Sequence, residues 1–221
     1  MSTPVTGGNV SLYNETFDAN GQPQPIYPTP VIGMVGIIDD LSKICGQSWQ
    51  NAGDLIYLLG ANTKPQLGAS EYLNTVHQTV AGMPPAIDFS LELKVQAACR
   101  HGIRQGWIKS AHDPAEGGMA VALAESCIGL GLGAAVKLPS LGLRLDEDFF
   151  GESGTRILVS IDPSNRSAFE LYLQSQLTAD WLPVGVVGGD RLQITAQGGS
   201  IDLSLAEITT SWTMALDRRL A

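Results

Sequence analysis

The stretch from His112 to Cys127, HDPAEGGMAVALAESC, constrains the fold of this chain more than any other. Asp113 can act as a helix N-cap, and Pro114 fits the first helical turn or the turn before it. Gly117 and Gly118 let a backbone or a ligand approach closely, because neither residue carries a Cβ. The MAVALAESC that follows is rich in strong helix formers and nearly uncharged. We therefore expect a helix that is buried on most of its surface.

The start of this helix has two interpretations. Its free N–H groups and its two glycines could favour an anion. A buried helix with a glycine-rich start and no ligand explains the same residues, and local sequence alone favours it.

Composition excludes several classes of protein. The 221 residues carry a formal net charge of −9 and no cluster of Lys and Arg, so we expect no nucleic-acid partner. The apolar runs are too short to span a membrane, and no secretory segment is recognised at the N-terminus. The three cysteines are far apart and fit no zinc-binding spacing. These features predict a cytoplasmic protein without a membrane partner.

Hydrophobic periodicity predicts an α+β fold, in which helices pack on a mixed β-sheet. We expect strands over residues 10–13, 31–38, 54–60, 134–137, 157–161, 184–187, 191–196 and 200–203, the last three as a meander. We expect helices over residues 71–78, 90–104, 119–127, 167–177 and 205–216. Ser90 is the expected cap of the second helix, and residues 17–30 are expected to form a loop without strand pairing. The stretch GGNVSLYNE begins so abruptly that we expect its natural neighbours to be missing.

Four segments resemble phosphoribosylformylglycinamidine synthase, the ligase of the fourth step of purine biosynthesis. They are GGNVSLYNE, PTPVIGMVG, HDPAEGGMAVALAE and FGESGTRILVS, in this order. The first is the most specific. The others occur more loosely in relatives such as aminoimidazole ribonucleotide synthetase. The resemblance covers essentially the whole chain. It implies that residues 1–30 end a preceding ATP-binding domain with its linker, and that residues 31–221 form a C-terminal domain like that of aminoimidazole ribonucleotide synthetase.

The resemblance also implies an activity. Enzymes of this family use ATP and Mg²⁺ to activate the formyl amide oxygen of a nucleotide substrate, formylglycinamide ribonucleotide. Ammonia derived from glutamine then displaces the phosphate and gives an amidine. The implied partners are the remaining synthetase domains, a glutaminase subunit and a small accessory subunit. Most ligands and the catalytic histidines belong to earlier domains, so we expect this chain to be inactive alone and to hold no general acid or base.

The family motif implies roles for three residues near the start of the chain. Gly8 would approach ATP, Asn9 would be a Mg²⁺ ligand, and Ser11 would contact the substrate. A hard amide oxygen suits Mg²⁺, which takes few protein ligands when phosphates complete its shell. The alternative for Asn9 is a turn residue.

Asp113 and Glu152 match positions that bind Mg²⁺ and substrate in the family's first repeat. This chain resembles the second repeat, so these residues would line a pseudo-symmetric pocket and would not be catalytic. The alternative for Glu152 and Arg156, which are four residues apart, is a structural ion pair. Two further readings of the whole chain remain open. One is a non-catalytic module that docks onto or stabilises a partner. The other is a different member of the same ATP-binding superfamily.

Overall fold

The computed structural model describes residues 3–220. The chain divides into two compact units, Met1–Asp39 and Asp40–Ala221, and each is described below by itself. The predicted domain boundary after residue 30 falls within the first unit and stays a prediction.

The first unit contains one antiparallel pair of strands, β1 (Glu15–Phe17) and β2 (Pro23–Pro25). Asp18 Oδ1 closes the turn between them by accepting backbone N–H bonds from Asn20 and Gln22, at 2.9 and 2.8 Å. The expectation that residues 17–30 pair with no strand was therefore wrong. Two prolines are tolerated because both strands of a two-stranded ribbon are edge strands.

The strands predicted over residues 10–13 and 31–38 are absent. Both stretches lack regular structure, and Val31 and Val35 are 92% and 98% exposed. A strand requires a neighbour for its backbone N–H and C=O groups, and no strand of residues 3–220 pairs with either run. Apolar composition alone cannot supply that neighbour.

The second unit is built on a seven-stranded mixed sheet in the order β4-β6-β3-β7-β5-β8-β9. Only the β5–β8 pair is parallel. The strands are β3 (Leu55–Leu59), β4 (Ile108–His112), β5 (Ala134–Lys137), β6 (Ile157–Ile161), β7 (Trp181–Val187), β8 (Arg191–Ala196) and β9 (Gly199–Ser204). This mixed sheet with packed helices confirms the predicted α+β class.

Seven α-helices accompany the sheet within the described residues. They are α1 (Glu71–His77), α2 (Phe89–Arg104), α3 (Gly118–Ile128), α4 (Leu145–Phe150), α5 (Arg166–Leu177), α6 (Leu205–Thr213) and α7 (Ala215–Leu220). Short 3₁₀ turns cover Leu41–Lys43 and Pro163–Asn165. The sequence did not predict β4 or α4. No helix of residues 3–220 is both long and apolar enough to cross a membrane.

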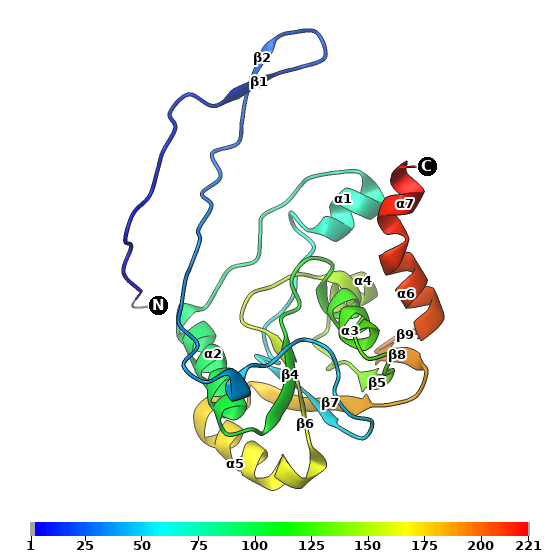
Figure 1. Ribbon diagram of the computed structural model, residues 1–221. Helices are drawn as coiled ribbons and strands as arrows, with labels where there is room; N and C mark the ends of the chain where they lie inside the picture. The colour runs from blue at the N-terminus through cyan, green and yellow to red at the C-terminus, as the bar shows by residue number, and fades with distance from the viewer. Residues whose placement is uncertain (1–2, 221) are drawn as a thin grey trace. The chain divides into compact units, whose positions relative to one another are not determined.

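Both faces of the sheet are covered at β3, which explains why this interior strand is apolar throughout. Alternate residues of β3 point to opposite faces of the sheet and pack into two different hydrophobic cores. Ile56 and Leu58 pack with α3, α4 and α6, whereas Tyr57 and Leu59 pack with α2 and α5. Figure 1 shows α2 and α5 together on one side and α3 and α6 on the other. The predicted buried helix is α3, at the centre of the first core.

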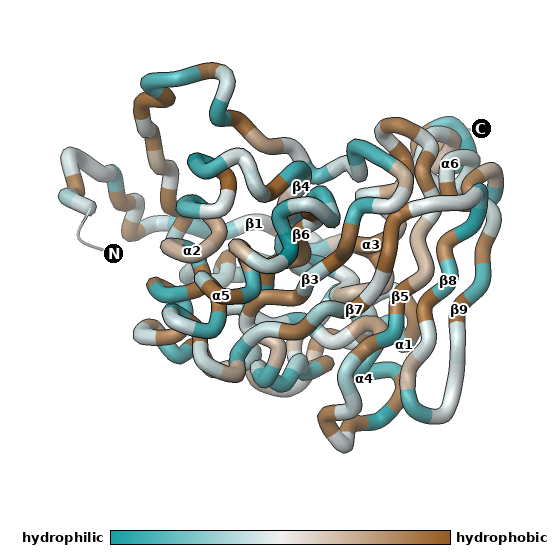
Figure 2. Tube along the Cα trace, turned by 90° about the horizontal axis from the view of Figure 1, so that it is seen from below, coloured by the Kyte–Doolittle hydropathy of each residue, from teal (hydrophilic) through white to brown (hydrophobic). Residues whose placement is uncertain are grey.

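The predicted meander of the last three strands was wrong, because β5 lies between β7 and β8. Gly133, just before β5, exchanges backbone hydrogen bonds with the turn that follows β7. Its N–H donates to Gly189 O at 2.9 Å, and its O accepts from Gly188 N–H at 2.7 Å. This turn therefore carries the chain past β5 and does not close a hairpin. Along β8, polar and apolar residues alternate as expected (Figure 2).

Two predicted helix ends also need correction. The side chain of Asp88, not Ser90, caps α2, accepting from the N–H groups of Ser90 and Leu91. The last predicted helix is divided between α6 and α7, and Met214 separates them. Ile208 is buried as expected, but Trp212 is 57% exposed, so this helix buries less of its apolar face than its spacing indicated.

Candidate functional site

The loop between β4 and α3 forms the centre of the candidate site. The N-cap of α3 is Gly117, with φ of +77°, and no side chain caps the helix. The expectation that Asp113 is the N-cap was wrong, because the loop is longer than the motif suggested. Asp113 instead exposes 76% of its side chain.

Gly118 does allow a close approach, but the approaching group is the protein's own backbone, whereas a Cβ on Gly117 would meet the side chain of Val121. A Cβ on Gly118 would lie 2.5 Å from Gly151 O and 2.7 Å from the carbonyl carbon of Phe150. The φ of Gly118 is also positive, at +64°. Only glycine satisfies both constraints, so this position seats the start of α3 on the chain that follows α4.

An anion does lie near the start of α3, and it is the carboxylate of Glu152. Its Oε1 accepts the backbone N–H of Gly117 at 3.1 Å and that of Glu71 at 2.8 Å. Gln66 pairs with Glu152 in an isolated antiparallel bridge. Glu152 therefore links the first turns of α1 and α3 to one carboxylate, where each helix dipole favours negative charge.

His112, at the end of β4, is held between two carboxylates. Its Nε2 lies 2.7 Å from Glu125 Oε2, and its Nδ1 lies 3.7 Å from Asp113 Oδ1. Within the described part of the chain, no group of three or more His, Cys, Asp or Glu residues could hold a metal ion.

Arg156 lies deep beneath this loop and is only 4% exposed. The ion pair considered between Arg156 and Glu152 does not form, because Glu152 faces backbone N–H groups. Burial lowers the pKa of Arg156 to about 10, and the nearby carboxylate of Asp148 partly opposes that shift. Arg156 is therefore charged at neutral pH. Burial also raises the pKa of Asp148.

A cavity of about 530 Å³ lies between α2, the end of β4 and residues 153–157. It brings together two residues that the sequence singled out, Asp113 and Arg156, whereas Glu152 is outside its lining. Glu92 and Ser153 also line it. The sequence analysis missed both. The available signal was the acidic Glu92 in the first turn of the helix, four residues before Gln96.

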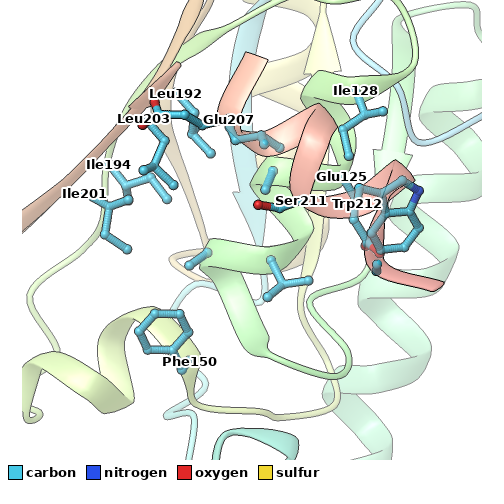
Figure 3. A pocket seen from close by; sticks show the side chains of 15 residues that line it. Glu125, Ile128, Phe150, Leu192, Ile194, Ile201, Leu203, Glu207, Ser211 and Trp212 are labelled. Atoms are coloured by element: carbon cyan, nitrogen blue, oxygen red, sulfur yellow. The ribbon is translucent and has the colours of Figure 1, made fainter. Parts of the chain in front are cut away.

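A second cavity, of about 410 Å³, is largely apolar and lies between α3, α6 and the last strands. Figure 3 shows Phe150 on one side of it and Trp212 on the other, with side chains of β8 and β9 lining a third side. Its two carboxylates are already engaged: Glu125 contacts His112, and Glu207 accepts from Ser204.

The site residues predicted in the first unit lie in an exposed stretch without regular secondary structure. Gly8, Asn9 and Ser11 are exposed, and a Cβ on Gly8 would meet no atom within 4 Å. The Ser11 hydroxyl donates to Tyr13 O at 3.1 Å. These residues and Asp113 belong to different compact units, so the surroundings of each are described only within its own unit.

Solved structures share the fold of most of this chain. The complex of T. maritima PurL with FGAR aligns with 76% of the chain and 30% of its own length, with a TM-score of 0.60 and 19% identity. The structure of PurLQS from Thermotoga maritima aligns with 76% of the chain and 28% of its own length, with a TM-score of 0.58 and 15% identity. At these identities the similarity concerns the fold alone.

Relatives of higher identity match the whole chain. It is 55% identical to phosphoribosylformylglycinamidine synthase subunit PurL of Synechocystis sp. and 56% identical to that of Nostoc sp.. The chain spans 29% of the length of each relative. Residues 51–196 match the model of the AIR synthase related protein, C-terminal domain. Because that model covers well over half of the sequence, the chain belongs to the AIR synthase related family and carries its C-terminal domain.

Proposed function

We propose that this chain is the C-terminal portion of phosphoribosylformylglycinamidine synthase, an ATP-dependent ligase of purine biosynthesis. The observation that carries the proposal is the identity of 55% with subunit PurL of Synechocystis sp. over the entire chain. The complete enzyme would convert formylglycinamide ribonucleotide and ammonia to the amidine. In this proposal residues 1–30 end the preceding ATP-binding domain, and the rest is the C-terminal domain. A cytoplasmic location stays a prediction.

The proposed contribution of the first unit to the active site is Gly8 toward ATP, Asn9 toward Mg²⁺ and Ser11 toward the substrate. The open surroundings of Gly8 and the exposed amide of Asn9 fit this assignment. Structures of T. maritima PurL with ATP and with ADP support the nucleotide. Mg²⁺ would neutralise phosphate charge, and one amide oxygen suits a shell that phosphates and other domains complete. No residue of this chain is proposed as a general acid or base.

Asp113 and Glu152 have a different proposed role, in a pseudo-symmetric pocket of the second unit. Glu152 accepts two backbone N–H bonds, so it would shape this pocket and not bind a ligand directly. Asp113 remains exposed at its loop. The proposed partners are the remaining synthetase domains, a glutaminase subunit and a small accessory subunit. The solved PurLQS assembly of Thermotoga maritima supports this kind of complex.

A chimeric enzyme tests the proposed function. The matching C-terminal segment of the Synechocystis sp. relative is replaced by this chain, and ATP-dependent amidine formation is measured with ammonia as the nitrogen donor. We expect kcat/KM within about tenfold of the parent enzyme, which corresponds to about 1.4 kcal/mol of transition-state free energy. The isolated 221-residue chain should show no turnover. A folded chimera without activity, or turnover by the isolated chain, would refute the proposal.

A further inference from the structure

The cavity lined by Asp113 and Arg156 also contains most of the unpaired buried side-chain polar atoms among the described residues. Within residues 3–220, five buried side-chain N or O atoms lack a hydrogen-bonding partner in the protein. Four of them belong to Glu92, Ser153 and Arg156, and all three residues line this cavity. A buried polar group without a partner is costly, so such a concentration points to a ligand that supplies the partners.

Among these residues, Arg156 gives the strongest indication of a ligand. Two of its guanidinium nitrogens, Nε and Nη1, have no partner. No carboxylate oxygen of the described residues lies within ion-pair distance of it, since every ion pair found there involves other residues. A buried guanidinium with free N–H groups is suited to donate hydrogen bonds to a carboxylate or another oxyanion. The Ser153 hydroxyl, which is also free, can donate to the same anion.

Glu92 offers the opposite chemistry in the same cavity. Its Oε1 accepts from Gln96 Nε2 at 2.6 Å, whereas its buried Oε2 has no partner. A Cβ placed on Gly154 would lie 3.8 Å from Glu92 Oε2, which brings this oxygen close to the backbone that follows Ser153. A free buried carboxylate oxygen favours an ammonium group.

The charges around the cavity disfavour a simple polyanion as its ligand. The cavity has one buried guanidinium, but the carboxylates of Glu92 and Asp113 also line it, and His112 is engaged by Glu125. A phosphate would gain Arg156 and face two negative groups. A molecule with adjacent negative and positive groups would satisfy both sides, because Arg156 and Glu92 face one cavity without pairing with each other.

We propose that this cavity binds a small zwitterion of the α-amino acid class. Its carboxylate accepts from Arg156 and Ser153, and its ammonium donates to Glu92 Oε2. The volume of about 530 Å³ leaves room for a side chain. This proposal does not rest on the proposed ligase function.

Titration of the isotopically labelled 221-residue chain tests the site. The probes are glycine, serine and glutamine, with acetate, methylammonium and inorganic phosphate as partial analogues at matched ionic strength. The NMR signal of Arg156 Nε–Hε reports binding. We expect a saturable shift with at least one amino acid at millimolar concentration or below, and affinities about tenfold weaker or worse for all three partial analogues.

Glu92→Gln provides the sharpest variant, because it keeps the shape of the side chain and removes its charge. It should weaken amino acid binding about tenfold or more, and Ser153→Ala should weaken it less. Glu116→Gln, at an exposed position, is the matched control and should leave the affinity unchanged. The proposal is overturned if no amino acid gives a saturable shift, if acetate or phosphate binds as tightly as the amino acids, or if Glu92→Gln binds like the unaltered chain.

Discussion

Glu152 illustrates how one side chain can link the starts of two helices by accepting backbone N–H bonds from both. The sequence motif predicts a polar residue near a pocket, but it cannot distinguish a carboxylate that faces a ligand from one that faces backbone N–H groups. The distinction depends on Glu71 and Gly117, which are far from Glu152 along the chain and meet it only in the folded protein. The same limit applies to Arg156, whose predicted partner is occupied elsewhere.

Removal of the Glu152 carboxylate should destabilise the second unit. Glu152→Ala leaves the N–H groups of Glu71 and Gly117 without this partner, so we expect a loss of about 1–3 kcal/mol in the free energy of unfolding. Glu152→Gln retains an acceptor oxygen and should lose less. Denaturant unfolding of both variants measures the effect, and Glu116→Ala is the exposed control. Equal stability of Glu152→Ala and the unaltered chain would contradict the proposed link between the two helices.

At the scale of elements, sequence patterns identified those that carry their own local signal. Helix α3 follows from its alanine-rich run, and α5 from Phe169, Leu173 and Leu177, all of which are buried. The order of the strands in the sheet could not be predicted from the sequence. The position of β5 between β7 and β8 depends on long-range pairing around Gly133, for which the local sequence holds no signal. The strand predicted over residues 31–38 was wrong for the same reason. Its composition fits a strand, but no described strand pairs with it.

Gly118, the first residue of α3, and Gly131, in the turn after this helix, separate the cost of backbone strain from that of steric contact. Gly118 and Gly131 have similar φ values, +64° and +66°, but only Gly118 has backbone atoms where a Cβ would lie. Gly131→Ala should therefore cost only about 1–2 kcal/mol, the usual penalty of a left-handed residue. Gly118→Ala adds a clash with Gly151 O and should cost roughly 3–5 kcal/mol. Denaturant unfolding measures the free energy of unfolding of both variants. Comparable losses for the two would contradict the close approach of backbone atoms to Gly118.

The whole molecule consists of two units with different environments. The second unit has a two-sided core, whereas most apolar residues of 31–38 are exposed. We therefore predict fast amide hydrogen exchange over residues 31–38 and strong protection in β3. Mass spectrometry of peptides from the exchanged chain makes the comparison. Strong protection of residues 31–38 in a monomeric sample would contradict the exposed, irregular backbone of this stretch.

We propose that this chain contributes a metal ligand to a larger ligase, and substitutions of Asn9 in the chimeric enzyme test this role. If Asn9 gives an oxygen to Mg²⁺, Asn9→Ala should lower kcat/KM by about 10²-fold or more, roughly 3 kcal/mol. High Mg²⁺ should partly restore the rate, and Asn9→Asp should retain more activity than Asn9→Ala because it keeps an oxygen. A residue that serves only in a turn predicts a different order, with Asn9→Gly the best tolerated.

The decisive measurement is the Mg²⁺ dependence of amidine formation by the Asn9→Ala, Asn9→Asp and Asn9→Gly chimeras. We predict that Asn9→Ala and Asn9→Gly are both strongly impaired and partly rescued by Mg²⁺, and that Asn9→Asp is less impaired. Unaltered rates for Asn9→Gly, with an unaltered Mg²⁺ dependence, would contradict the assignment of Asn9 as a Mg²⁺ ligand.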